Sequence, residues 1–183
     1  MVTHASPGDA DAALLDRARA GDPEALDALV ARHHGAAFRV ALVIVGDDAD
    51  AADAAQDGMV RALKGLAHFR GEASFRTWLL AIVANEAKSQ LRRSTRRREA
   101  PLEDELSTGG EVGAAEALAL RDDAARVRAL LPRLPEKQRM AVQLRVDEGL
   151  SFREVGEVIG STEGAARVNY HHGIRRLREW LEE

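Results

Sequence analysis

The residues best suited to bind another molecule are one amide and the cations that follow it. Asn85, Lys88 and Arg92 recur at intervals of three and four residues, so on a helix they share one face. Amide side chains hydrogen-bond to base edges, and ammonium or guanidinium groups pair with phosphates. Four more arginines follow, namely Arg93, Arg96, Arg97 and Arg98. The pattern favours a surface that lies along nucleic acid, although alone it is equally typical of a core helix with a solvated basic end.

A long amphipathic helix must position these groups. Apolar residues recur at helical spacing and form one stripe, made of Phe75, Trp78, Leu79, Ile82, Val83, Ala87 and Leu91. Ser74 is a suitable N-cap, because its hydroxyl can accept a hydrogen bond from a free first-turn N–H. The segment Phe69–Ser74 is therefore predicted to be the turn that leads into this helix.

A second candidate binding face lies on the helix expected at about residues 49–66. This helix is acidic in its first half and basic later, with Arg61 and Lys64. Charges in that order stabilise a helix through its dipole, so they could serve stability alone. The functional alternative is a protein-docking face built on Asp53, Gln56 and Asp57.

The segment before this face predicts a helical bundle. Residues 21–24, Gly-Asp-Pro-Glu, combine the signals for the end of one helix and the start of the next. The helix that follows is apolar on nearly every side between Phe38 and Val45, which predicts a central position. His33 and His34 lie on it about 100° apart, so a structural or surface role is expected for them and no metal site.

The character of the chain changes after residue 98. Residues 99–113 contain Pro101, an acidic cluster and Gly109-Gly110, without hydrophobic periodicity. This composition predicts a flexible linker between a first module, residues 9–98, and a second module, residues 114–183. The predicted fold class is all-α, with two helical modules.

The second module has the layout of a helix-turn-helix. The expected helices are residues 114–131, residues 136–147, a short helix after Ser151, and residues 163–181. Ser151 and Glu154 form a capping box, and Gly160 lies in the turn before the last helix. The buried stripe of that helix is expected at Ala166, Tyr170, Gly173 and Leu177.

Several residues around this turn and on the outer face of the last helix could contact DNA. The candidates are Arg153, Arg167, Val168, His171, His172 and Arg175. Arginine reads guanine edges or binds phosphate, and a valine can contact a thymine methyl group. The alternative is an amphipathic C-terminal helix with a solvated basic face.

Composition limits the remaining possibilities. The chain has 183 residues, of which 45% are hydrophobic, 31% charged and 4% aromatic, and this is typical of a soluble helical protein. Cysteine is absent, so no disulfide or thiolate metal site can form. No targeting signal or apolar run of membrane-span length is apparent, and a cytoplasmic location without membrane insertion is expected.

The net charge of −4 argues against unaided DNA binding. Acidic residues concentrate in 9–57 and 99–123, and basic residues in 70–98 and 167–178. The expected protein binds DNA poorly unless a partner holds it there.

Four stretches resemble the extracytoplasmic-function group of the bacterial sigma-70 family. They are residues 20–26, residues 53–57, residues 69–79 with Ala84-Asn85, and the second module from Leu134-Pro135 through Gly149-Leu150-Ser151 to Gly164 and the arginine-rich last helix. The resemblance runs from about Asp11 to Leu181. It identifies the first module as sigma region 2 and the second as sigma region 4.

The resemblance implies an RNA polymerase sigma factor that recognises and opens promoters. Asp53, Gln56 and Asp57 would bind the clamp helices of the largest subunit of core RNA polymerase. Contacts to the −10 element would come from Phe69, Arg70, Ser74, Asn85, Lys88 and Arg92, with the loop Phe69–Ser74 receiving an unstacked base. The DNA candidates of the second module would read the −35 element, and this module would also contact the polymerase flap. No catalytic residue, metal or cofactor is implied, and an anti-sigma factor is a candidate partner.

The chain also departs from the family pattern. Ala165-Ala166 stand where a Thr-Val pair is usual, and Asn169 and His172 stand where arginines are usual, so an unusual −35 sequence is expected. Bulkier residues are also usual in place of Ala54-Ala55 and Gly58-Met59.

Two other interpretations have specific weaknesses. A LuxR-like helix-turn-helix regulator would carry alternating strands in its first part, whereas residues 9–98 show helical periodicity. A sigma mimic that sequesters an anti-sigma protein would lack the cations between Lys88 and Arg98. An enzyme is disfavoured, because the sequence shows no nucleophile–base pair, metal-spaced cluster or Gly-rich phosphate loop.

Overall fold

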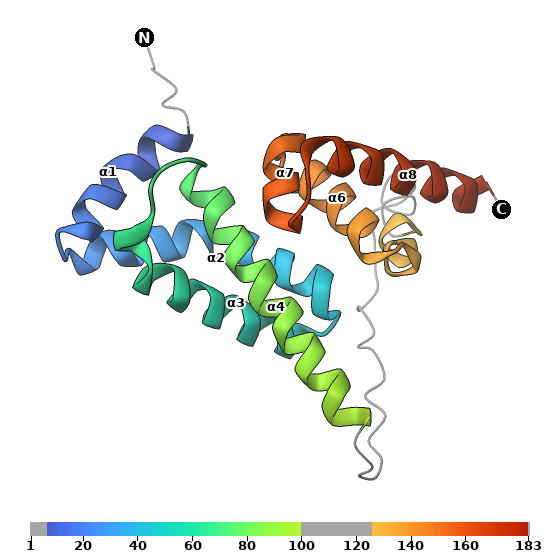
Figure 1. The fold of residues 1–183 in the computed structure, drawn as a ribbon, viewed down its shortest axis with the longest axis horizontal. Coiled ribbons are helices and arrows are strands. Elements are labelled where there is room, and N and C mark those ends of the chain that lie inside the picture. The colour runs from blue at the N-terminus through green and yellow to red at the C-terminus, as the bar shows by residue number, and fades with distance from the viewer. Residues whose placement is uncertain (1–6, 100–125, 183) are drawn as a thin grey trace, which may run out of the picture.

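The computed structural model describes residues 7–99 and 126–182, and these ranges contain helices, turns and loops but no strand (Figure 1). The helices are α1 (Pro7–Arg19), α2 (Pro23–Val45), α3 (Asp48–Lys64), α4 (Phe75–Glu99), α6 (Glu136–Val146), α7 (Phe152–Ile159) and α8 (Glu163–Glu182). Short 3-10 helices lie at Leu66–His68 and Leu131–Arg133, and residues 126–130 are also helical. The predicted all-α class is confirmed. Apart from Glu99, which ends α4, the predicted linker lies outside the described residues, as does the start of the helix expected at residue 114.

Helix α2 is the central helix of the first module. The Asp22 side chain caps it by accepting hydrogen bonds from the backbone N–H groups of Glu24 and Ala25, and Gly46 ends it with a φ of 80°. Its buried side chains pack against α1, α3 and α4, as the apolar sequence predicts. His33 is also buried and pairs with Asp11 of α1 at 3.0 Å, so the structural role expected for it is confirmed.

Helix α2 is long and apolar enough to cross a membrane by length and composition alone, and 39% of its most apolar window is buried inside the fold. On those two measures the expectation that no apolar run reaches membrane-span length is wrong. A helix in a protein core can pass the same test, and α2 contacts α1, α3, α4 and α6.

Helices α3 and α4 approach each other closely at Gly58. An added Cβ at this glycine would lie 2.8 Å from both the Cα and a Cγ of Val83. Four alanines of α3 are also buried in the core, namely Ala51, Ala54, Ala55 and Ala62. Small side chains on α3 therefore let the backbone of α4 pack close to that of α3.

Helix α4 begins as the sequence predicts. The backbone N–H of Thr77 donates to the Ser74 hydroxyl at 3.1 Å, which confirms Ser74 as the N-cap. The predicted stripe is buried at Phe75, Leu79, Val83 and Ala87, and half-buried at Trp78, Ile82 and Leu91. The helix is thereby fixed along α2 and α3, and α7 contacts it as well.

The second module forms the predicted helix-turn-helix from α7 and α8. Ser151 and Glu154 make a complete capping box, and Gly160 ends α7 with a φ of 69°. Ala166, Gly173 and Leu177 are buried and Tyr170 is half-buried, so the predicted inner stripe of α8 is confirmed. Gly173 is required by packing, because a Cβ there would lie 2.7 Å from a Cγ of Val142 on α6.

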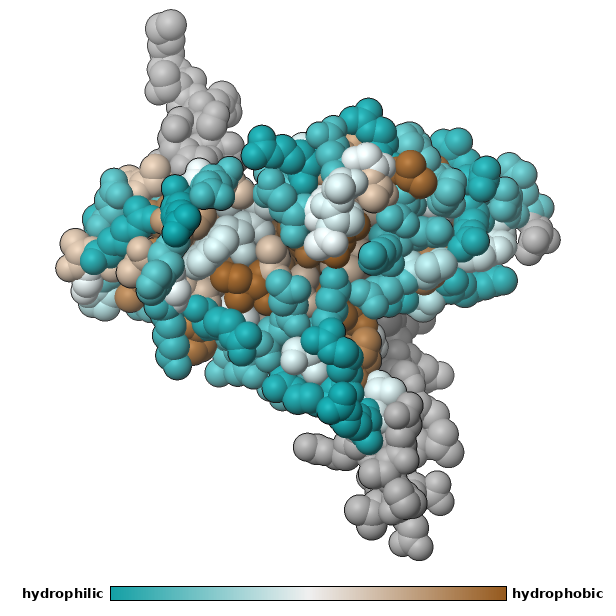
Figure 2. Space-filling view, viewed as in Figure 1, coloured by the Kyte–Doolittle hydropathy of each residue, from teal (hydrophilic) through white to brown (hydrophobic). Residues whose placement is uncertain are grey.

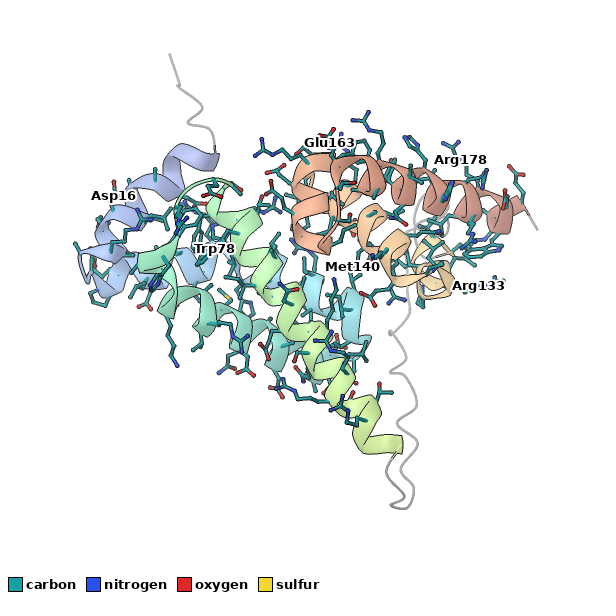
Figure 3. All side chains as sticks on the ribbon, viewed as in Figure 1. Asp16, Trp78, Arg133, Met140, Glu163 and Arg178 are labelled. Carbon is teal, nitrogen blue, oxygen red and sulfur yellow. The ribbon has the colours of Figure 1, made fainter. Side chains whose placement is uncertain are left out.

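The two modules pack against each other, which the sequence did not predict. Helix α7 lies against α4 and α6 lies against α2, and the labelled Met140 of α6 lies on the side that faces the first module (Figure 3). One continuous core cluster includes residues from both modules, and a smaller cluster around Leu131, Leu134 and Leu177 belongs to the second module alone.

Candidate nucleic-acid interface and docking surface

Helix α3 presents the three predicted docking residues together. Asp53, Gln56 and Asp57 are all exposed, and with Gln90 and Arg93 of α4 they line one polar hollow. Val60, one turn further along α3, is 42% exposed and adds an apolar contact point. The arrangement offers carboxylates, amides and one accessible aliphatic side chain, which suits a protein partner with basic groups.

A buried carboxylate supports this hollow. Glu86 of α4 is 3% exposed and accepts from Arg93 at 3.0 Å, and its other oxygen lies 3.0 Å from a nitrogen of Arg61. Glu86 thus holds one cation on each of the two helices that border the docking residues. Sequence reasoning missed Glu86, because Arg93 lies seven residues away and Arg61 lies on another helix, so no short-range pattern pairs them.

The loop before α4, which is predicted to receive an unstacked base, is held in place by contacts with its neighbours. The Phe69 ring packs on Phe75 and Trp78, with centroid distances of 5.8 and 5.0 Å, and the Arg19 guanidinium lies 5.8 Å from its centroid. Arg19 also donates to the Phe69 carbonyl at 2.6 Å. Phe69 is therefore an anchor of the loop, held by its neighbours, while Arg70 is exposed. The Ser74 hydroxyl is engaged in capping α4, since it also pairs with the Thr77 hydroxyl at 2.8 Å.

The predicted nucleic-acid face of α4 is only partly open. Asn85 and Arg92 are exposed. Lys88 is half-buried, because its ammonium group donates to the Ile159 carbonyl at 3.4 Å and lies 3.9 Å from a carboxylate oxygen of Glu136. Burial lowers the pKa of Lys88 from its ordinary value. In this arrangement the second module covers Lys88, and its predicted contact with DNA stays a prediction.

The outer face of α8 carries all of the DNA candidates predicted for that helix. Arg167, Val168, His171, His172 and Arg175 are exposed, and so is Arg153 at the start of α7. Val168 is 53% exposed, so its methyl groups are accessible to a partner. Hydrophilic side chains cover this outer face and the C-terminal part of α4 (Figure 2). The candidate DNA-contacting residues of α8 are therefore accessible from solvent.

The exposed arginines of the helix-turn-helix are held in place by local partners. Arg167 donates to Glu163 at 2.8 Å, and Arg153 donates to Glu157 at 3.2 Å. The guanidinium groups of Arg145 and Arg167 lie 5.1 and 5.0 Å from the centroid of the Phe152 ring, within cation–π distance. His171 lies 6.2 Å from the same ring. Phe152 therefore connects α6, α7 and α8 beneath the candidate reading residues, a role that the sequence did not indicate.

Comparison with known proteins agrees with this architecture. The family described as Sigma-70 region 2 matches residues 29–97, and the family described as Sigma-70, region 4 matches residues 124–177. The chain is 36% identical over 171 residues to the ECF RNA polymerase sigma factor SigM of Mycobacterium tuberculosis, covering 93% of this chain and 84% of SigM. It is 32% identical over 182 residues to the ECF RNA polymerase sigma-E factor of Escherichia coli, covering 94% and 92%.

Solved structures show the same fold. The structure of CnrH in complex with the cytosolic domain of CnrY has a TM-score of 0.69 and 26% identity, over 94% of this chain and 97% of CnrH. The sigma factor RpoE of Bartonella quintana, solved with the anti-sigma factor NepR, has a TM-score of 0.67 at 21% identity, over 85% of this chain and 96% of RpoE.

An all-α bundle followed by a helix-turn-helix, matched in that order by regions 2 and 4, defines a two-region initiation factor. The chain belongs to the extracytoplasmic-function group of the sigma-70 family. It is an RNA polymerase sigma factor that directs promoter recognition. The region 2 match over the first module disfavours the LuxR-like alternative.

Proposed function

We propose that residues 9–98 bind core RNA polymerase and the −10 element, that residues 99–113 connect the modules, and that residues 114–183 read the −35 element. The observation that supports this proposal is that the predicted docking residues lie on α3, whereas the predicted DNA-contacting residues lie on α4. The acidic residues Asp53 and Asp57 line a hollow on α3, whereas Asn85 and Arg92 lie exposed on α4. A partner can therefore hold the protein through α3 while α4 contacts DNA.

The proposal includes no catalytic step and no cofactor, and it places the protein in the cytoplasm, where core polymerase and promoter DNA meet. It also includes control by an anti-sigma protein. In support, CnrH, which matches nearly the whole chain, was solved in complex with the cytosolic domain of CnrY.

Reconstituted transcription tests the proposed function directly. Purified protein added to core RNA polymerase should start transcription from a subset of genomic fragments, and sequencing of the transcripts should reveal shared −10 and −35 elements. The protein alone should bind duplex DNA weakly, because its net charge is −4. Tight binding by the protein alone, without any polymerase-dependent start site, would contradict the proposal.

Asn85→Ala should impair promoter opening more than polymerase binding. An amide that hydrogen-bonds to an exposed base contributes about 1–3 kcal/mol, so open-complex formation should fall roughly 5- to 150-fold. The measurement is the fluorescence of a 2-aminopurine base in the −10 element, beside a polymerase-binding titration. Gln56→Ala is the matched amide control and should show the opposite pattern. Equal loss of both activities in Asn85→Ala would make Asn85 a structural residue.

Arg167→Ala should weaken recognition of the −35 element by about 1–3 kcal/mol if its guanidinium contacts a base. The comparison is between the selected promoter and variants with single substitutions in the −35 element. Arg178→Ala, which removes an exposed arginine from the last turns of α8, is the matched control (Figure 3). If Arg167→Ala weakens all promoters alike and reduces the salt dependence, Arg167 contacts phosphate and reads no base.

A further inference from the structure

A carboxylate of the second module is clamped by two arginines of the first. Glu148 follows the end of α6, and its side chain is 3% exposed. Arg39 of α2 donates to both of its carboxylate oxygens, at 2.6 and 3.1 Å. Arg76 of α4 donates to one of the same oxygens and to the Glu148 backbone carbonyl, the latter at 2.8 Å. One residue of the second module thus joins two helices of the first.

Three further polar contacts run in the same direction, from a donor or cation of the first module to an acceptor of the second. The Thr77 hydroxyl donates to Glu154 at 3.0 Å, and Lys88 contacts the Ile159 carbonyl and lies near Glu136. In every case the donor belongs to the first module and the acceptor to the second. Hydrogen bonds with Glu148 raise the pKa of Arg39. Burial would raise the pKa of Glu154, but hydrogen bonds from Ser151 and Thr77 and the nearby Arg76 lower it overall. Both shifts favour the charged forms that the interface uses.

Apolar packing lies beneath these contacts. One core cluster combines second-module residues with first-module residues, namely Met140, Ala141, Leu144, Leu150, Val155, Val158 and Ile159 with Val40, Ile44, Leu80 and Ala84. The interface therefore has an apolar centre with charged pairs at its edge, which is the composition of a specific docking surface.

This packing holds the two candidate reading faces close together. Lys88 lies one turn from Asn85 and touches Ile159, which precedes Arg167 by eight residues. Chain geometry alone then keeps Asn85 and Arg167 within roughly 40 Å of each other. Elements centred at −10 and −35 are about 25 base pairs apart, or roughly 85 Å of duplex at ~3.4 Å per base pair. The packed arrangement cannot reach both elements of one promoter.

We propose that the Arg39–Glu148–Arg76 clamp locks the free sigma factor in a closed state, and that engagement of core polymerase must break this lock to separate the modules. The inference rests on the proposed assignment of the −10 and −35 elements. In the closed state Lys88 is withheld from DNA by the same interface, so opening both spreads the modules and frees a candidate −10 contact.

Energy transfer between two dyes measures the separation of the modules. The chain has no cysteine, so Asp16→Cys on α1 and Arg178→Cys on α8, both exposed, provide two unique labelling sites (Figure 3). The full chain should show high transfer when free and low transfer with core polymerase. Glu148→Gln, which keeps the shape and removes the charge, should raise the ratio of open to closed molecules at least about tenfold, because it leaves two arginines without their buried partner.

Matched variants separate this lock from general damage. Arg39→Ala should also open the protein, and since Arg39 is 53% exposed its loss should leave each module folded, as checked by circular dichroism. Glu179→Ala, which removes an exposed carboxylate that pairs only with Arg175 of the same helix in the described structure, should leave transfer unchanged. Unchanged high transfer in both Glu148→Gln and Arg39→Ala overturns the lock. Low energy transfer in both variants upholds the lock. If the unaltered protein then starts no promoter-dependent transcription, the lock stands and the proposed function is overturned.

Discussion

Replacing Asp53 and Asp57 together by lysine is expected to reduce the affinity for core RNA polymerase at least about 100-fold, with the free protein still folded. Both carboxylates are exposed and border the hollow that Gln56, Gln90 and Arg93 complete. Reversal of two charges changes the local charge by four units, because two attractive carboxylates are lost and a basic partner then faces two positive charges. Loss of charged interface pairs typically costs 2–5 kcal/mol each, so a 100-fold change is a low estimate.

The measurement is a binding titration of labelled protein against core polymerase at two salt concentrations. The matched control is Asp16→Lys with Asp27→Lys, which makes the same change in net charge at exposed positions on α1 and α2. This control should bind nearly as well as the unaltered protein. If both double variants weaken binding equally, the effect is one of overall charge and α3 is not the docking helix.

Local structure was predictable because its causes are local. Asp22 caps α2, Ser74 caps α4, and Ser151 with Glu154 begins α7, and in each case the donor and acceptor lie within three residues of each other. The inner stripes of α4 and α8 follow from helical periodicity in the same way. Exposure of the candidates on α3 and α8 then follows, because residues opposite a buried stripe face outward.

Contacts between the modules could not be predicted in this way. Arg39 and Arg76 reach Glu148 across 109 and 72 residues, and no short-range pattern pairs them. The partial burial of Lys88 has the same origin, since helical spacing put it beside Asn85 but could not show that α7 would cover it. The ring contacts of Phe69 with Phe75 and Trp78 were likewise not predicted, and a base contact at Phe69 stays a prediction.

The structure explains one departure from the family pattern, the glycine at position 58. From sequence it is a glycine where a bulkier residue is usual, within the candidate docking segment. In the structure it is buried at the point where α3 meets the backbone of α4 at Val83. The same close approach sets the spacing between the docking residues of α3 and their neighbours Gln90 and Arg93.

Substitution of Gly58 is therefore expected to cost more stability than its helical position suggests. An alanine in a helix interior normally gains up to about 1 kcal/mol over glycine. At Gly58 the new Cβ would lie 2.8 Å from the Cα of Val83, which cannot move without the helix. Overpacking costs about 1–3 kcal/mol, so Gly58→Ala should lose about 1–2 kcal/mol net, and Gly58→Leu about 3 kcal/mol or more.

Thermal and urea unfolding measure these losses, with Gly164→Ala and Gly164→Leu as controls. A Cβ at Gly164 meets no atom within 4 Å, so both controls should stay within about 1 kcal/mol of the unaltered protein. In a chain of this length each kcal/mol lowers the unfolding temperature by about 2–4 °C. Gly58→Ala should also weaken polymerase binding, because separating α3 from α4 pulls Asp57 and Gln56 away from Gln90 and Arg93. A stable Gly58→Leu variant with normal binding would show that the two helices can move apart freely, and that the hollow between them does not form the docking surface.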